Sequence, residues 1–393
     1  MQSIFEIDLL LLEIILLAVF ICSFFYQLYF YLKYISIVLR SNKREKKGKI
    51  EFQIQKKPVS VIICARDEYE NLREFLPDIL SQDYPEYEVI VVNDGNDEDT
   101  ELLLSDLKKV YTHLRSTFVP DGAKNLSTKK LALTLGIKAA KYDWLLFTDA
   151  DCVPVSKNWI ASMARNFSEK TEFVLGYGAY FEEKSFLNRL ITYDTLFIAL
   201  QYLGFAAAGK PYMGVGRNMA YRKDVFYSQN GFASSLNLRS GDDDLIVNKS
   251  ATKENTRIET SANSVTMSNP NKRFKAWRYQ KERHLSVSSS YTTKSKNRLV
   301  IEPVSRFVFY ATFLFLLIDS VAVQNWWLTG GVALIFLMRY ITQAIIINKS
   351  SSYFGGRKYF LSILIFDILL PLIVAYLLTF GRMGSRSRYI DWK

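Results

Sequence analysis

The N-terminal stretch of this 393-residue chain is almost unbroken in its apolar and aromatic character between Ile4 and Leu39. A helix needs only about 20 such residues to cross the hydrocarbon core of a bilayer. A signal peptide would instead begin with basic residues and have a short apolar core, whereas this segment carries Glu6 and Asp8. The sequence therefore predicts a retained transmembrane anchor over residues 1–40.

A basic linker, residues 41–57, follows the anchor and opens with the run Asn42–Lys49, which is dense in lysine and arginine. Short clusters of this kind mark the cytoplasmic side of a membrane and can also rest on anionic lipid headgroups. The basic run could also be a solvated linker, which is compatible with a cytoplasmic position and with contact to lipid headgroups. We therefore expect the domain that follows to be cytoplasmic and the N-terminus to lie on the other side.

Residues 303–380 hold three further apolar segments, at 305–323, 326–347 and 359–380. Strict alternation of three spans would place the tail 381–393 outside, although that tail contains three arginines and a lysine. This breaks the rule that positive charge stays inside. One of the three segments could therefore be re-entrant or interfacial, and the sequence leaves open whether all three span the membrane.

The residues between the membrane segments have the composition of a globular domain, predicted to cover 58–302. Continuous apolar runs at 59–65, 88–94 and 144–149 fit parallel strands that are buried on both faces. Apolar residues at helical spacing predict helices at 68–81 and 129–141. This alternation predicts an α/β domain with a mostly parallel sheet.

The chain is poor in the residues that many other catalytic classes use. It has only three cysteines, without paired spacing, and two histidines, which argues against a disulfide framework, a zinc site or a Ser/His triad. A net charge of +11 favours an anionic partner. The apolar ends identify that partner as a lipid bilayer, and no nucleic acid is expected. The chemistry is expected to run on carboxylates.

Acidic residues follow the third predicted strand as Asp149-Ala150-Asp151. Ligands of parallel sheets bind beyond the carboxyl ends of the strands, and two carboxylates so spaced can share a hard cation such as Mg²⁺ or Mn²⁺. The alternative is a turn with Asx caps. Polar residues also follow the other two strands, at Arg66 and Glu68 after the first and at Asp94 after the second.

A second acidic group, Gly241-Asp242-Asp243-Asp244, lies late in the domain. Like charges this close cost energy without a cation, a general-base role or a compensating basic residue. The segment is therefore the best candidate for a general base that accepts a proton from an acceptor hydroxyl. A solvated acidic turn is the alternative.

Basic and flexible residues complete the candidate site. Lys129 and Lys130 begin the helix that leads to Asp149, where an ammonium group could meet a diphosphate. Gly216 and Arg217 do not form a dinucleotide-binding loop, but a glycine there would let the backbone approach a bound sugar. The amphipathic basic segment at about 271–300 carries Arg283, which could face a leaving diphosphate, and could itself lie along lipid headgroups.

In this order the motifs resemble family 2 glycosyltransferases of the GT-A fold, in particular the membrane-bound bacterial branch. The segment that includes Ala65, Arg66 and Glu68 looks like the end of the family's first strand, and Asp94 is similar to its nucleotide-binding aspartate. The resemblance further implies that Lys129 binds substrate, that Asp149 and Asp151 bind the metal, and that Asp243 is the catalytic base.

Gln280-Lys281-Glu282-Arg283-His284 resembles the Gln-x-x-Arg-Trp motif of processive synthases, with His284 in place of the tryptophan. Because that tryptophan helps to hold the acceptor sugar in the family, the replacement puts polymer synthesis in doubt. The resemblance implies roles for Gln280 and His284 in substrate binding and for Arg283 in catalysis.

The implied reaction is an inverting transfer of a sugar from a nucleotide-diphosphate donor to a lipid-linked or glycan acceptor, at the cytoplasmic membrane of a bacterium. A transporter or membrane scaffold with a degenerate nucleotide-binding domain is the main alternative, with Asp319 and Asp367 as its polar candidates within the spans. A nucleotidyl- or phosphotransferase would need a glycine-rich loop after the first strand, which the sequence lacks.

Overall fold

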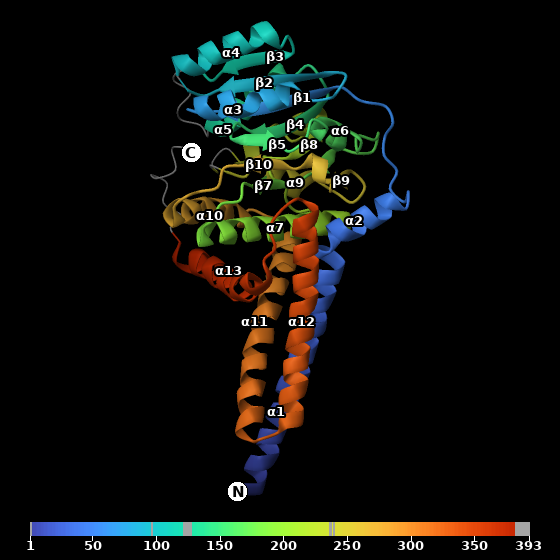
Figure 1. Ribbon diagram of the computed structural model, residues 1–393, viewed down its shortest axis with the longest axis vertical. Coiled ribbons are helices and arrows are strands. Elements are labelled where there is room, and N and C mark those ends of the chain that lie inside the picture. The colour runs from blue at the N-terminus through green and yellow to red at the C-terminus, as the bar shows by residue number, and fades with distance from the viewer. Residues whose placement is uncertain (1, 96, 121–127, 236–237, 239, 382–393) are drawn as a thin grey trace.

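The computed structural model describes residues 2–95, 97–120, 128–235, 238 and 240–381, so all but the first residue of the predicted basic tail lies outside the described residues. An α/β domain forms one end of the molecule, and long helices extend from it as a bundle (Figure 1).

A seven-stranded sheet forms the centre of the domain and confirms the predicted α/β class. Strands β3, β2, β1 and β4 are mutually parallel. Strand β8 runs antiparallel to its neighbours β4 and β6, and β9 runs parallel to β6. The three predicted strands correspond to β1, β2 and β4. In spatial order the strands are β3 (Leu114–Phe118), β2 (Tyr87–Asn93), β1 (Val59–Ala65), β4 (Trp144–Asp149), β8 (Met219–Arg222), β6 (Phe173–Leu175) and β9 (Thr256–Ile258).

Both faces of this sheet are covered, which explains why its strands are continuous apolar runs. Alternate residues of β1 enter different cores: Val61 and Ile63 pack with one group of helices, and Ile62 and Cys64 with the other. The first group is α3 (Tyr69–Leu80), α4 (Glu98–Val110) and α6 (Trp159–Ala164). The second includes α5 (Thr128–Ala139) and α7 (Phe186–Ala207).

A three-stranded sheet lies next to the large one and brings distant segments of the chain to the end of β4. Its order is β5 (Cys152–Pro154), β10 (Thr266–Ser268) and β7 (Gly178–Tyr180). In this sheet Ser268 is paired with Cys152. Cys152, which directly follows the predicted metal motif, is therefore held by a strand more than a hundred positions further along the chain.

Short helices connect the remaining strands, and one longer helix lies beneath the sheet. They are α8 (Lys223–Ser228), α9 (Asp244–Ser250), α10 (Phe274–Ser288) and the 3-10 turns Ala233–Ser235 and Ala262–Ser264. The predicted interfacial segment 271–300 is not one element, because α10 ends at Ser288 and a new helix starts at Thr293. That new helix runs directly into the predicted span.

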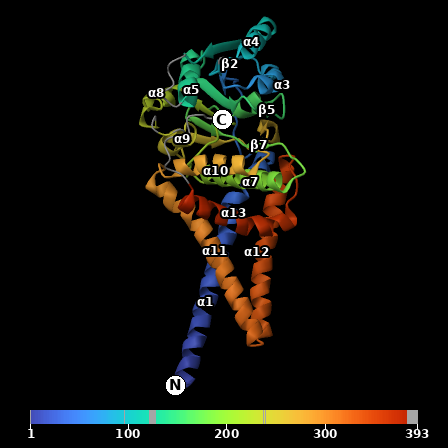
Figure 2. The ribbon, with the colours of Figure 1, turned by 90° about the vertical axis from the view of Figure 1, so that its left-hand side faces the viewer.

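Among the described residues, five helices are long and apolar enough to cross a membrane. One of them, α7, is mostly buried in the domain. The N-terminal helix α1 (Gln2–Phe30) continues through a π-helical turn (Tyr31–Ile35) into α2 (Ile37–Lys46), which carries the basic run. The others are α11 (Thr293–Ala322), α12 (Trp326–Tyr353) and α13 (Phe360–Phe380). Figures 1 and 2 show α1, α11 and α12 running away from the domain, with α13 lying across them.

Candidate active site

Two carboxylates stand at the carboxyl end of β4. Asp149 is the last residue of that strand, and Asp151 is fixed by two donors: the Ser268 hydroxyl at 2.8 Å and the Cys152 thiol at 3.4 Å. Potential ligand atoms of Asp149, Asp151 and Cys152 all lie within 4.8 Å of one another. The carboxylate oxygens are hard donors of the kind that Mg²⁺ and Mn²⁺ prefer, so the residues present fit such an ion.

The two carboxylates have different electrostatic surroundings. Burial alone would raise the pKa of Asp149, but Lys129, Arg217 and Arg283 together hold that pKa below its usual range. For Asp151, burial and the negative charge of Asp149 raise the pKa. A cation between them would favour the charged form of both.

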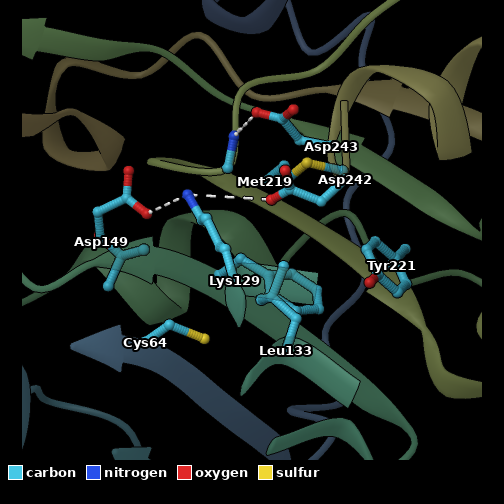
Figure 3. A pocket seen from close by; sticks show the side chains of 11 residues that line it. Cys64, Lys129, Leu133, Asp149, Met219, Tyr221, Asp242 and Asp243 are labelled. Atoms are coloured by element: carbon cyan, nitrogen blue, oxygen red, sulfur yellow. Dashed lines mark hydrogen bonds and ion pairs between the residues drawn. The ribbon is translucent and has the colours of Figure 1, made fainter. Parts of the chain in front are cut away.

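Lys129 connects the two acidic groups of the sequence. From the start of α5 its ammonium lies 3.1 Å from Asp149 Oδ1 and 3.9 Å from Asp242 Oδ2, as Figure 3 shows. Burial opposes the charge, but the carboxylates of Asp149, Asp242 and Asp243 outweigh it and raise the pKa of Lys129. Lys129 is therefore a permanent positive charge inside the site.

The three consecutive aspartates point in three directions. Asp242 faces Lys129, and burial raises its pKa. Asp243 caps α9 and accepts hydrogen bonds from the backbone N–H groups of Gly216 at 2.7 Å and Asp244 at 2.8 Å. The carboxyl group of Asp244 accepts from the Tyr291 hydroxyl at 2.8 Å, away from the other two.

A pocket opens between these acidic groups, and the close-up in Figure 3 looks into it. Its polar residues come from β4, α5, the loop before β8 and the loop before α9. Apolar side chains and the thiol of a cysteine form the rest of the lining. The lining residues are Lys129, Thr148, Asp149, Gly216, Asp242 and Asp243, with Cys64, Leu133, Phe147, Met219 and Tyr221.

Arg217 contributes its side chain to this site, whereas Gly216 contributes its backbone N–H group. The Arg217 guanidinium lies 4.2 Å from the centre of the Tyr180 ring and donates to the Ala179 carbonyl at 3.3 Å. It also lowers the pKa of the nearby Asp149. Gly216 contributes its backbone N–H and leaves space beside Asp243, because a Cβ there would meet that carboxylate only at 3.4 Å.

Helix α10 supplies the residues of the Gln-x-x-Arg-His segment. It is tied to α7 by Lys281, whose ammonium contacts both oxygens of Asp194 at 2.6 and 2.7 Å. Gln280 donates to the Tyr180 hydroxyl at 3.1 Å, which brings it beside the Arg217–Tyr180 pair. Arg283 lies close enough to lower the pKa of Asp149.

His284 lies on α10 and is exposed, although the surrounding protein still desolvates its ring. Desolvation there, followed by the positive charges of Arg283, Arg217 and Lys281, lowers its pKa to about 3. The imidazole is therefore neutral near pH 7. It can accept or donate one hydrogen bond but adds no positive charge for a diphosphate.

Two predicted site residues lie outside this arrangement. Lys130 was expected to bind substrate, but its side chain is only 1% exposed and its ammonium donates to the carbonyls of Ser235, Leu238 and Ser240. It anchors the segment before Gly241 and does not line the pocket. Asp244 was expected to be catalytic, yet it is 4% exposed, is bonded to Tyr291 and does not line the pocket.

The residues after β1 and β2 lie at the same sheet edge but outside the pocket lining. Ala65 is buried at the end of β1, and its carbonyl accepts from the Asp94 backbone N–H at 2.8 Å. Asp94 thereby sits beside the end of β1. Arg66 and Glu68 follow in the connection to α3, where Glu68 accepts from the Asn71 side chain.

Several residues of the site escaped the sequence analysis. Cys64, Met219 and Tyr221 line the pocket, Ser268 holds Asp151, and Tyr180 stacks on Arg217. They are isolated, ordinary residues in strands, so only the pairing of strands reveals their position. Cys64 is paired with Asp149 across strands β1 and β4. Both strands were predicted, so their pairing was the available signal that Cys64 lies in the site.

The fold with this acidic edge is that of a GT-A glycosyltransferase. A mannosyltransferase from Pyrobaculum calidifontis, solved in complex with GDP-Man and Mn²⁺, superposes with a TM-score of 0.56 at 16% sequence identity, covering 94% of this chain and 99% of that chain. At this identity the likeness shows the fold.

Sequence comparison finds similar proteins. The family model described as "Glycosyl transferase family 2" matches residues 60–228 of this chain. Poly-beta-1,6-N-acetyl-D-glucosamine synthase of Staphylococcus epidermidis is 36% identical over 95 residues, which are 24% of this chain and 22% of the relative. The Staphylococcus aureus (strain COL) synthase is 26% identical over 156 residues, 37% of this chain and 36% of the relative. The matched part thus spans between about a fifth and about a third of these relatives.

Proposed function

We propose that the protein transfers a sugar from a nucleotide-diphosphate sugar to an acceptor hydroxyl, with inversion at the anomeric carbon, at the cytoplasmic face of a bacterial membrane. The acceptor would be a lipid-linked or glycan molecule used in the cell envelope. One observation carries the proposal: the two acidic groups of the sequence meet across Lys129 at the carboxyl edge of the sheet. Ligands of such sheets bind at that edge.

Asp149 and Asp151 would hold Mg²⁺ or Mn²⁺. When bound, this ion would supply Lewis-acid neutralisation of the departing diphosphate. Lys129, Arg217 and Arg283 surround the same region and would offset the remaining negative charge. These three groups are already positioned by Asp149, by Tyr180 and by α10, so little side-chain ordering would be needed on donor binding.

Asp243 is the proposed general base. The hydrogen bonds from the backbone of Gly216 and Asp244 fix its carboxylate beside the pocket. In a single displacement, Asp243 would accept the proton of the attacking hydroxyl while the bond between the sugar and the diphosphate breaks. Direct attack by the acceptor produces inversion and needs no covalent enzyme intermediate. Asp242 would not take part in the proton transfer, because its carboxylate is paired with Lys129.

The alternative function as a transporter receives no support from Asp367, one of its two candidate residues. Asp367 is fully buried and ion-paired with Arg306 and Arg339. A transport pathway requires polar groups that face a water-filled route. A paired and buried carboxylate fits a structural role better.

The test is a donor screen with membranes that contain the full-length protein. UDP-N-acetylglucosamine and GDP-mannose come first, because the relatives and the superposed structure act on or bind sugars of these types. Release of nucleoside diphosphate is followed with and without lipid extract, with Mg²⁺, Mn²⁺ or a chelator. Transfer that needs a divalent ion supports the proposal. Equal release from Asp243→Asn membranes would refute the role of Asp243.

A further inference from the structure

The last apolar helix, α13, has the length and composition of a membrane span but a different orientation from the other membrane helices. Figures 1 and 2 show it lying across the α1, α11 and α12 bundle, directly beneath the domain. One side of α13 packs on α7: the Phe366 ring lies 5.5 Å from that of Phe186 and 5.3 Å from that of Tyr193. A bond of 2.6 Å from Arg189 to Ser362 adds to this contact.

The opposite side of α13 is apolar and exposed. Four residues at helical spacing, Leu361, Ile365, Ile368 and Leu372, are between 47 and 73% exposed, while Ile363, Phe366 and Leu370 are buried. A transverse helix with an uncovered apolar face would be unfavourable in water, because each such side chain contributes about 1.5–3 kcal/mol when it leaves water. Helices α11 and α12 also expose apolar side chains, among them Leu314 and Leu334.

A buried carboxylate locks α13 in this orientation. Asp367, halfway along the helix, accepts from Arg339 at 2.8 Å, from Gln343 at 2.8 Å and from Tyr310 at 2.8 Å. Arg306 lies 3.2 Å away and is also bonded to Glu302. The four ionised groups balance to zero net charge, which is the arrangement that makes buried charges tolerable in an apolar environment.

The depth of this cluster agrees with a place inside one leaflet. From Arg306 the helix α11 continues for 16 residues to Ala322, and along α12 Arg339 lies 13 residues after Trp326. At about 1.5 Å per residue these lengths are about 24 and 20 Å. Adding the diameter of about 10 Å of α13 gives about 34 and 30 Å, close to the thickness of about 30 Å of the hydrocarbon core.

We propose that α13 is an in-plane membrane helix whose exposed face contacts the acyl chains of the leaflet next to the catalytic domain. The chain then has three spans, α1, α11 and α12, and both ends of α13 are on the domain side. This resolves the conflict raised by the basic tail, because a tail that starts on the domain side obeys the positive-inside rule. The proposal concerns membrane placement and does not depend on the proposed transferase activity.

The test measures depth along two helices in full-length protein in lipid vesicles. Single cysteines replace Leu361, Ile365, Ile368 and Leu372 on α13, in a Cys22→Ser background, since Cys22 is exposed and the other two cysteines are buried. A bimane label on each is quenched by lipids that carry nitroxides at known depths. The matched control set on α12, also exposed, is Leu334, Leu337, Ile341 and Ile345.

We expect one common depth for the α13 labels and a gradient for the α12 labels, whose ends are separated by about 16 Å along the helix axis. A C-terminal reporter of sidedness should lie on the side of the domain, and an N-terminal one on the other. A gradient along α13 like that of α12, a C-terminus on the far side, or α13 labels quenched only from water would each overturn the proposal. Because the substituted side chains are exposed, the variants should fold.

Discussion

The backbone N–H of Gly216 donates a 2.7 Å hydrogen bond to Oδ2 of Asp243. This contact joins the loop before β8 to the start of α9 and fixes one oxygen of the proposed base. Because Asp243 Oδ1 accepts from the Asp244 N–H, both oxygens are oriented by the backbone rather than by other side chains.

Asp243→Asn should abolish sugar transfer and leave the protein folded. The asparagine carbonyl can keep one of the two hydrogen bonds that the carboxylate accepts from Gly216 and Asp244. It cannot accept a proton, and general-base catalysis is typically worth 10²- to 10⁴-fold. Nucleoside diphosphate release and thermal unfolding should be measured together. Asp224→Asn is the matched control, because that carboxylate is exposed and does not line the pocket. Near-native turnover of the Asp243 variant would contradict the assignment.

Asp151→Asn should weaken the binding of Mn²⁺ by at least about tenfold, because it removes one of two anionic ligands. The unbound Mn²⁺ can be counted directly by electron paramagnetic resonance, without any assay of activity. Asp224→Asn serves as the control, since that carboxylate is exposed and paired only with Arg222. Unchanged Mn²⁺ binding in the Asp151 variant would place the metal elsewhere.

Lys130→Met should lower both thermal stability and turnover while leaving donor affinity nearly unchanged. The substitution removes the donor to three backbone carbonyls that lead into Gly241, and buried carbonyls left without a partner cost about 1–3 kcal/mol each. A Lys129→Met variant should instead weaken donor binding, because Lys129 faces the pocket. If both variants lost donor affinity to the same extent, Lys130 would contribute to donor binding as Lys129 does, rather than only to the structure of the segment before Gly241.

The Lys130 side chain also predicts a dependence of stability on pH. Burial lowers its pKa to about 8, below the value of about 10.4 in an unfolded chain. Between these two values the unfolded state binds more protons than the native state, so this group should make the free energy of unfolding rise with pH. Denaturant titrations at pH 8 and pH 10 should show that Lys130→Met lacks this increase. An equal increase in the variant would assign the pH dependence to other groups.

His284→Asn should leave the shape of the pH–rate profile unchanged between about pH 5.5 and 8. The imidazole has a pKa lowered to about 3, mainly by desolvation and then by nearby cations, so it stays neutral across this range. An unperturbed histidine would titrate near pH 6.5. The profile of kcat/KM should be recorded for both proteins. A limb near pH 6.5 that disappears in the variant would show that His284 does titrate.

The sequence was sufficient to predict the parts of the fold that are determined locally. Strands β1 and β4 match their predicted ranges because strands buried on both faces consist of continuous apolar residues. Strand β3 was missed, since Arg115, Ser116 and Thr117 occupy its centre and it is only partly buried. The acidic edge was also predictable, because parallel strands end at the same side of a sheet.

What could not be predicted is the direction in which neighbouring side chains point. Lys129 and Lys130 are adjacent in a helix, where successive side chains are about 100° apart, so one faces the pocket and the other faces a loop 105 to 110 positions away. Asp243 and Asp244 differ for the same reason. The orientation of α13 depends on the pairing of Asp367 with two other helices, and hydropathy carries no such information.

Asp367→Leu should destabilise the membrane part of the protein strongly. The substitution is apolar and suits a lipid environment by itself, but it leaves Arg339 and Arg306 without the carboxylate that pairs with both. Removing one partner of a buried ion pair typically costs about 3–5 kcal/mol. Thermal unfolding of the purified protein in detergent measures the effect, with Asp319→Asn near the α11–α12 turn as the control. If Asp367→Leu unfolded at the wild-type temperature, the cluster would not be what holds α13 across the bundle.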